Sequence, residues 1–472
     1  MVVRPWILLL LSRAVAGLPV PSPAQLRYQS TDFVALIHFN MGTFAHNGDP
    51  CCDKTNWNVQ APYAAGKTSD AGTFNPKQLN TTQWMESIAA LGANIAVLTA
   101  KHGCGFALWP TEATLPDGSP YGYNVGMPGA AIQYDVLQRF VDSAKSAGVG
   151  YGFYYSIMKN FYLCHNFSGK NSCMEEVLPR QRNVSEQDYI RIARQQVTEL
   201  WTKYGNLSRI WVDSGLGGLG SLMDELQPQA AGTPKNPIDW CGTESGHPSR
   251  DVGSSDVWST GHGYFGQADA DEWVPKFCDP QLFEEHIWFW EPNLHVRSLS
   301  EMIPIYHDIV GRGMVMELAF SIDREGLVQK SHASVYGQLG AWVRNCYGSP
   351  LAATSGPGMA FTLTLEAGSQ FDRIQLQEDI VLGQRVRNYT LEQSKGSGWH
   401  PLVRGSAIGR KRIHLLSATQ VSERTQLRLR IENATRLPQI RQFAAFSPCQ
   451  EVQEASDTGL GTGPPQSPTK RG

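Results

Sequence analysis

The chain has 472 residues, 41% of them hydrophobic, and a formal net charge of -3 at pH 7. This length is enough for a large buried core and predicts two domains. A net charge so close to zero gives no electrostatic basis for binding nucleic acid or an anionic membrane surface, so we expect neither partner.

The N-terminus has the pattern of a secretory signal peptide. Arg4 precedes a short apolar stretch, residues 6–11, and small residues follow at positions 14–17, as in a cleaved leader. The stretch is too short to span a bilayer, and no other run reaches ~20 apolar residues. We expect residues 1–17 to be a signal peptide and the protein to be secreted or delivered to a lysosome or vacuole.

Apolar runs alternate with amphipathic segments over residues 25–350. The runs are continuous in apolar residues, which is typical of buried parallel strands, and they occupy residues 33–39, 95–100, 149–155, 209–212, 287–290 and 314–320. Amphipathic helices are expected between them, for example at 83–91, 135–147 and 186–204. This alternation predicts the α/β class and a (β/α)8-like barrel, with a doubly wound sheet as the main rival.

The pattern changes near residue 350. Residues 349–358 are rich in Gly, Pro and Ser, and short alternating strands follow at 361–365, 371–376, 385–392, 412–416 and 426–432. These strands predict a C-terminal all-β sandwich over residues 358–449. Residues 451–472 are polar and rich in Pro and Gly, which predicts a disordered tail.

Sequons and cysteines fit an oxidising, secretory compartment. Asn-x-Ser/Thr sites, the acceptors of N-linked glycans, begin at Asn80, Asn166, Asn183, Asn206, Asn388 and Asn433. The nine cysteines predict a few disulfides with at least one thiol left over. No C-x-x-C pair or Cys/His cluster has zinc spacing, so we predict neither a metal nor a cofactor.

Polar residues at the ends of the predicted strands are the candidates for chemistry, because barrel active sites lie where strands end. Asp213 and Glu244 each follow a short apolar strand. Two such carboxylates suit glycoside hydrolysis, in which one attacks or stabilises and the other donates a proton. A helix N-cap is the alternative interpretation of either residue.

Imidazoles and aromatic rings lie at the same strand ends. His38 and His102 close separate strands, and Lys101 precedes the second of them. A single histidine at a strand end is more often structural than a ligand, but two beside aromatic residues favour a polar ligand lined by rings. Ring faces with His and Lys hydrogen bonds at the rim describe a sugar pocket.

These segments, in this order, resemble the retaining α-L-fucosidases of glycoside hydrolase family 29. The shared motifs begin at His38 (HFNMGTF), Ala100 (AKHGCGFALW), Tyr154 (Tyr-x-Ser), Trp211 (Trp-x-Asp) and Trp240 (Trp-x-Gly-x-Glu-x-Gly). Trp258, Trp273 and Trp288 follow in the order of plant and bacterial members, and residues 371–392 resemble the family's discoidin-like sandwich. The resemblance covers residues 28–448.

The resemblance implies an exo-glycosidase that removes terminal α-L-fucose from oligosaccharides or glycoproteins. Asp213 matches the nucleophile and Glu244 the acid/base, with Glu272 and Glu291 as alternatives for the acid; a retaining mechanism requires the two carboxyls about 5–5.5 Å apart. The branch with a nearby acid suggests a preference for α-1,3/1,4-linked fucose. The residues expected to bind the sugar are His38, Trp57, Lys101, His102, Tyr154 and Trp288.

The sequence also departs from the family pattern within its most specific motif. Gly103 and Cys104 stand where a second His and an Asp are usual, so a hydrogen-bond donor to the sugar is missing. We favour an active enzyme with a divergent subsite. The alternatives are a catalytically impaired, lectin-like homologue and a related retaining hydrolase for another galacto-configured sugar.

Overall fold

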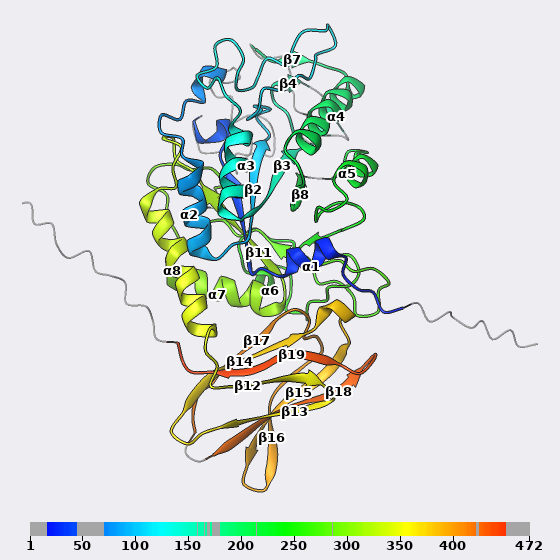
Figure 1. The fold of residues 1–472 in the computed structure, drawn as a ribbon, viewed down its shortest axis with the longest axis vertical. Helices are drawn as coiled ribbons and strands as arrows, with labels where there is room; N and C mark the ends of the chain where they lie inside the picture. The colour runs from blue at the N-terminus through cyan, green and yellow to red at the C-terminus, as the bar shows by residue number, and fades with distance from the viewer. Residues whose placement is uncertain are drawn as a thin grey trace, which may run out of the picture.

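The computed structural model describes residues 17–44, 70–157, 159–164, 166–167, 170–171, 180–213, 215–285, 287–421 and 424–449. An α/β part and an all-β part lie one above the other along the long axis of the molecule (Figure 1). Most of the predicted signal peptide and all of the predicted tail lie outside the described residues.

The α/β part is built on one curled sheet of seven parallel strands. Their order is β8 (Arg209–Asp213), β3 (Gly150–Ser156), β2 (Ile95–Lys101), β1 (Phe33–His38), β11 (Val315–Ser321), β10 (Lys276–Cys278) and β9 (Asp239–Trp240). Strands β1, β2 and β11 are buried along their whole length, as their continuous apolar sequences require. The sheet curls far enough for Trp211 on edge strand β8 to donate to Glu317 on β11, 2.8 Å away.

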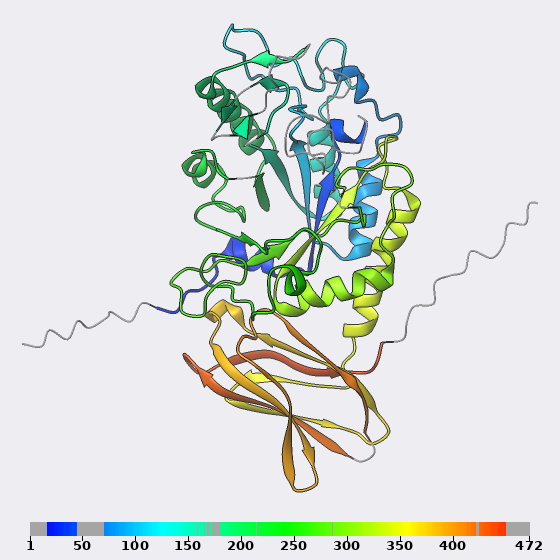
Figure 2. The same ribbon diagram turned by 180° about the vertical axis from the view of Figure 1, so that it is seen from behind.

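Helices surround the curled sheet, and most cover its outside, whereas α1 lies at the end where the strands begin (Figures 1 and 2). They are α1 (Pro23–Gln29), α2 (Thr81–Leu91), α3 (Val136–Ala147), α4 (Glu186–Lys203), α5 (Gly220–Leu226), α6 (Pro248–Asp251), α7 (Leu299–Ile309) and α8 (Lys330–Tyr347). Side chains cap several helix starts: Asn80 accepts from the backbone of Gln83, and Ser298 forms a capping box with Glu301, which satisfies N–H groups that lack helical partners. None of the described helices is long and apolar enough to cross a lipid bilayer.

Short elements fill the connections. The 3-10 turns are η1 (Met41–Thr43), η2 (Ala71–Thr73), η3 (Val310–Arg312) and η4 (Ile380–Leu382). Beyond the end of β3, strand β4 (Leu163–Cys164) pairs with β7 (Arg182–Asn183), and β5 (Asn166–Phe167) pairs with β6 (Lys170–Asn171). These pairs lie on the side of the sheet where its strands end.

The C-terminal part is a sandwich of two antiparallel four-stranded sheets. One sheet has the order β12 (Ala352–Pro357), β19 (Gln439–Phe446), β14 (Gln370–Glu378) and β17 (Arg412–Gln420). The other has β13 (Ala360–Leu365), β18 (Thr425–Ala434), β15 (Val386–Lys395) and β16 (Gly398–Gly405). Apolar side chains from both sheets form one core between them, as alternating strands predict.

The sandwich covers the end of the sheet at which the parallel strands begin. Asp32, directly before β1, binds Lys411 Nζ at 2.5 Å and Arg410 at 3.1 Å, and these contacts lower the pKa of its carboxyl against the effect of burial. A disulfide between Cys346 of α8 and Cys449 also joins the two parts covalently. The sandwich therefore lies opposite the edge where the strands end.

The structure confirms the predicted fold class, a barrel-like α/β part followed by an all-β sandwich, and corrects some of its elements. Residues 287–290 form no strand but a loop, whose rings pack on the histidines of the site. Strands β9 and β10 have only two and three residues, too few to show a period. Strand β12, which carries Gly356 and Pro357, is an edge strand, where proline is tolerated.

Candidate active site

Candidate residues gather where the parallel strands end. His38 is the last residue of β1 and Lys101 of β2, Tyr154 lies in β3, and Asp213 ends β8. Because all seven strands are parallel, their carboxyl ends meet at one edge of the sheet. These side chains therefore lie at the same end of the sheet.

Asp213 is oriented by a neighbouring strand. Tyr154 Oη donates to Asp213 Oδ2 at 2.7 Å, and the parallel register places Tyr154 opposite Trp211 on β8. The Tyr154 and Trp211 rings lie 5.2 Å apart. A half-buried carboxylate at this edge thus has a fixed direction.

Behind Asp213 lies a network that sequence reasoning missed. The buried Glu317 carboxylate accepts hydrogen bonds from Tyr28 Oη (2.6 Å), Arg209 Nε (2.9 Å) and Trp211 Nε1 (2.8 Å). Two of these donors belong to β8, the strand that ends in Asp213. The network therefore connects the strand of the candidate nucleophile to β11 across the inside of the sheet.

The two histidines lie within a cluster of aromatic rings at the strand ends. His38 stacks on Trp288 with ring centroids 4.5 Å apart, and His102 stacks on Tyr154 at 5.4 Å. Phe289 meets both imidazoles edge-on, at 5.4 and 5.0 Å. Such a set of ring faces can pack against the apolar face of a sugar.

Both imidazoles are neutral near pH 7. Burial lowers the pKa of His38 to about 3, and burial, helped by nearby positive charges, lowers the pKa of His102 well below its ordinary value. The Leu36 carbonyl lies 3.3 Å from His38 Nδ1. A carbonyl can only accept, so Nδ1 carries the proton and Nε2 is left as an acceptor for a ligand hydroxyl.

Lys101 lies fully buried below this edge rather than on an exposed rim. Its Nζ donates to the Lys159 carbonyl at 3.1 Å and stands 4.4 Å from the Tyr155 ring centroid. Burial lowers the pKa of Lys101 to about 7, and the charge of Asp213 opposes that shift. The amine is thus electrostatically coupled to the candidate nucleophile.

Glu244 comes from the other side of the sheet. It lies four residues beyond β9, is exposed, and accepts from Gln281 Nε2 at 3.1 Å on Oε2. A disulfide, Cys241–Cys278, joins the ends of β9 and β10 just before Glu244 and Asp279. The loop that carries Glu244 is therefore covalently attached to the next strand.

Asp279 is a third carboxyl at this corner, and sequence reasoning missed it. It is buried and accepts from Trp240 Nε1 at 2.5 Å. Burial, then the charges of Glu244 and Glu317, raise its pKa well above the ordinary value. The sequence places Asp279 directly after Cys278, at the end of β10. Because β10 has only three residues, the sequence did not identify this position as a strand end.

Glu272 and Glu291, the alternatives for the acid, have different neighbours from Glu244. Glu272 is 3.2 Å from His262, which itself contacts Asp239 at the beginning of β9. Glu291 follows Trp290, whose Nε1 donates to Gln329 Oε1 at 2.7 Å. Trp57, expected to pack on the sugar, lies outside the described residues.

The divergent motif directly follows His102 of the aromatic cluster. Cys104 is disulfide-bonded and buried, and the carbonyl of Gly103 accepts from the backbone of Phe161 at 2.8 Å. Gly105 has φ of +88°, and a Cβ there would lie 2.1 Å from Asn160 Oδ1, so only glycine fits. The segment that departs from the usual pattern is structurally fixed.

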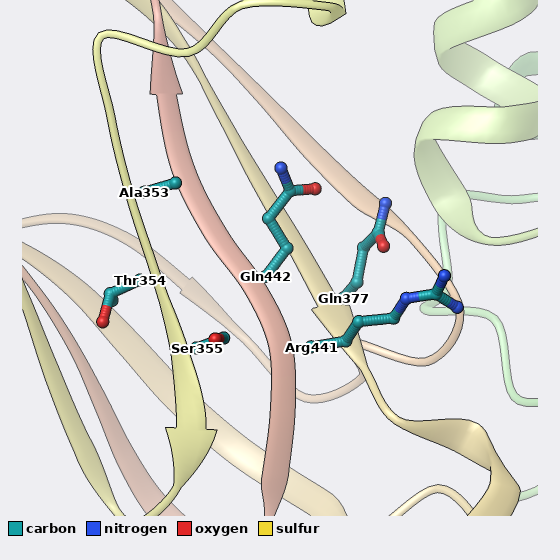
Figure 3. A pocket seen from close by; sticks show the side chains of 6 residues that line it. All are labelled: Ala353, Thr354, Ser355, Gln377, Arg441 and Gln442. Carbon is teal, nitrogen blue, oxygen red and sulfur yellow. The ribbon is translucent and has the colours of Figure 1, made fainter.

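Two other features lie away from these strand ends. Glu284, His295 and Glu301 bring ligand atoms within 4.8 Å of one another, but two of these residues are exposed and Glu301 already caps α7. On the sandwich, six residues line a polar depression that includes Gln377, Arg441 and Gln442 but no aromatic ring (Figure 3). Without a ring, that depression has no platform for stacking a sugar.

Comparisons with known proteins agree with this geometry. The model of the family described as alpha-L-fucosidase matches residues 50–348. The chain is similar to alpha-L-fucosidase 1 of Arabidopsis thaliana, with 27% identity over 91% of this chain and 88% of that protein, and to putative alpha-L-fucosidase 1 of Oryza sativa subsp. japonica, with 27% identity over 91% and 85%. Among solved structures, a putative alpha-L-fucosidase from Bacteroides thetaiotaomicron is 25% identical, with a TM-score of 0.76, over 91% of this chain and all of that one (100%).

Proposed function

Because this chain belongs to the α-L-fucosidase family and is a glycoside hydrolase, we propose that it removes terminal α-L-fucose with retention of configuration. Asp213 is the nucleophile and Glu244 the acid/base. The observation that carries this assignment is the 2.7 Å hydrogen bond from Tyr154 to Asp213, which orients a carboxylate beside the neutral imidazoles and rings of the aromatic cluster.

The two carboxyls divide the reaction between them. Asp213 Oδ attacks the anomeric carbon while Glu244 gives its proton to the leaving glycosidic oxygen, so that a fucosyl–enzyme ester forms and the aglycone departs. Glu244, now ionised, takes a proton from water as that water attacks the same carbon. The ester bond breaks, and fucose leaves with both carboxyls in their starting states.

The pocket supplies recognition. His38 and His102 exchange hydrogen bonds with fucose hydroxyls, Tyr154 adds a hydroxyl at the same edge, and Trp288 packs on the apolar face of the sugar. Trp57 is proposed for the same packing role on sequence grounds. A neutral imidazole suits an uncharged sugar, and His38, whose Nδ1–H faces the Leu36 carbonyl, offers Nε2 as an acceptor for a hydroxyl.

Two variants test the catalytic assignment. Asp213→Ala should abolish nitrophenol release from an aryl α-L-fucoside, and Glu244→Ala should lose activity that azide restores. Near-normal activity in Glu244→Ala would exclude this residue as the acid. Absence of turnover by the wild-type protein on aryl and natural fucosides would favour a lectin-like protein instead.

Substrate choice is a further part of the proposal. We expect α-1,3/1,4-linked fucose on oligosaccharides or glycoproteins to be released faster than α-1,2-linked fucose. Linkage-defined fucosylated glycans incubated with the purified protein test this ranking. An aryl α-D-galactoside in the same panel tests the alternative hypothesis that the enzyme hydrolyses another galacto-configured sugar. That hypothesis requires the galactoside to be cleaved at least as fast as the fucoside.

A secreted or lysosomal/vacuolar location completes the proposal. The disulfides Cys241–Cys278 and Cys346–Cys449 suit an oxidising compartment, and the sequon residues Asn80, Asn206 and Asn388 are exposed. Recovery of the protein from the medium or an acidic organelle, with a new N-terminus near residue 18 and glycans removable by a glycosidase, is the expected result. An intact Met1 on cytosolic protein would contradict it.

A further inference from the structure

We propose that Gln281 is a positioning residue for Glu244, and that its amide pairs with this carboxyl in both of the protonation states through which the reaction passes. The inference rests on the proposed role of Glu244 as acid/base. Gln281 lies 37 residues further along the chain and carries no motif of its own, but it contacts Glu244 at two points.

The contacts fix both the backbone and the side chain of Glu244. Gln281 Nε2 donates to Glu244 Oε2 at 3.1 Å, and the Gln281 backbone N–H donates to the Glu244 carbonyl at 3.3 Å. The Gln281 side chain is fully buried, whereas Glu244 is exposed. An acid that must meet a glycosidic oxygen is thereby tied to a buried side chain.

The segment that carries Gln281 is itself held from several sides. The carbonyl of the preceding Pro280 accepts from the Ala319 N–H of β11 at 3.1 Å, and the proline ring restricts the backbone there. Two residues earlier, Cys278 is bonded to Cys241. Gln281 therefore extends from a rigid base rather than from a free loop.

The amide oxygen, Gln281 Oε1, suggests why this position is a glutamine. Gln281 Oε1 is buried and has no hydrogen-bond partner among the described residues, an arrangement that costs stability and calls for an explanation. A carboxamide carries both donors and an acceptor. It can donate N–H to ionised Glu244 and, after rotating its terminal torsion by about 180°, accept the O–H of the protonated acid.

That rotation breaks no hydrogen bond at Oε1, because none of the described residues binds it. The amide can therefore follow the proton as Glu244 alternates between acid and base. The titratable groups around this corner are Asp279 after β10, Glu317 of β11, and the Arg250–Asp251 pair, where Asp251 accepts from Thr243 at 2.8 Å.

The test compares Gln281→Leu, Gln281→Glu and Glu244→Ala with wild type, measuring kcat/KM against pH for aryl α-L-fucosides with poor and good leaving groups. Gln281→Leu should lower kcat/KM for the poor leaving group by about 10- to 100-fold and for the good one much less, since only the former needs the acid. Both states lose a partner in this variant, but the charge-assisted hydrogen bond to the ionised form is the stronger one, so its loss should also move the alkaline limb up, by about one pH unit.

Gln281→Glu is the conservative variant and should behave differently. A protonated carboxyl both donates and accepts, so this variant should keep much of its activity at low pH and lose it earlier than wild type as the pH rises. If Gln281→Leu fails to fold, the pH dependence of Gln281→Glu activity is by itself sufficient to test the proposal. A loss that is the same at every pH and for both leaving groups would overturn the proposal.

Gln384→Leu is the matched control for loss of a buried amide. Gln384 Oε1 accepts from the Ser259 N–H at 3.1 Å, and its Nε2 has no partner among the described residues, but it belongs to the sandwich. It should cost stability and leave the pH profile unchanged. If azide restores the activity lost in Glu244→Ala but the pH profile of Gln281→Leu matches that of wild type, the Gln281 proposal alone is overturned. If Glu244→Ala keeps near-normal activity, or the wild-type protein is inactive, the proposed function is overturned too.

Discussion

The two candidate carboxylates are held by opposite sides of the same sheet in different ways. Asp213 ends a five-residue strand, and the next strand orients it through Tyr154. Glu244 follows a two-residue strand and depends on a disulfide and on Gln281. The nucleophile side is built from regular strands and a buried ion pair, and the acid side from cross-links between short segments.

This difference predicts which property, stability or catalysis, a mutation on each side should affect first. Regular strands distribute a perturbation over many backbone hydrogen bonds, so damage behind Asp213 should appear as loss of stability of the fold. A short, cross-linked segment has few such bonds, so damage beside Glu244 should appear first in proton transfer. The following predictions test that contrast.

The largest effect is expected behind Asp213, at Glu317. Glu317→Leu leaves the buried Arg209 guanidinium without its carboxylate, which should lower the free energy of unfolding by about 3–5 kcal/mol. Chemical denaturation measures this loss. The double variant Arg209→Met/Glu317→Leu should recover most of it, and a double variant no more stable than the single one would contradict the ion-pair account.

The next effect separates stability from catalysis at the two disulfides. Replacing Cys241 and Cys278 by Ala should cost about 2–4 kcal/mol of unfolding free energy and should also lower kcat/KM selectively for fucosides with poor leaving groups. The pair Cys346 and Cys449 closes a longer span of chain, 103 residues against 37. Its removal should cost at least as much stability without any dependence on the leaving group, and equal dependence in both pairs would contradict the contrast.

The smallest effect is an opposite response to pH at His38, which ends the central strand β1, and at Asp279 on the acid side. His38 has a folded pKa of about 3, below its unfolded value near 6.5, so its contribution to stability is present above pH 6.5 and is lost as the pH falls toward 3. Asp279 has a raised pKa, so its contribution is present below about pH 3.8 and is lost as the pH rises through its folded pKa.

Denaturation curves between pH 4 and 8 check these signs. As the pH falls, the free energy of unfolding should decrease less steeply in His38→Gln than in wild type, by about 1 kcal/mol per pH unit. Asp279→Asn keeps an acceptor for Trp240. In this variant the free energy of unfolding should decrease less than in wild type as the pH rises toward neutral. The same sign in both variants would refute the assignment of these buried states.

The same contrast explains how far the sequence could predict the molecule. Strands β1, β2, β3, β8 and β11 were predictable because each is a continuous apolar run, and the strand ends then pointed to His38, Lys101 and Asp213. The run at residues 287–290 misled for the same reason: its large rings are apolar, but they pack on His38 and His102 as a loop.

The acid side could be predicted only in part. Glu244 was found through a motif, but Asp279 and Gln281 act across 37 or more residues of sequence, through a hydrogen bond and a disulfide that no local pattern encodes. Glu317 is the one charged residue within the apolar run at 314–320. Its partners Tyr28, Arg209 and Trp211 become apparent only when the sheet curls.

The placement of the sandwich has a practical consequence. Because Arg410 and Lys411 attach it to Asp32, where the strands begin, the sandwich and the pocket occupy opposite poles of the molecule. At the far end of the sandwich, residues 396–397 form an exposed turn between β15 and β16 (Figure 1). A protein immobilised on a bead or sensor through a handle at this turn would present the strand ends outward, with the support on the side away from an approaching glycan.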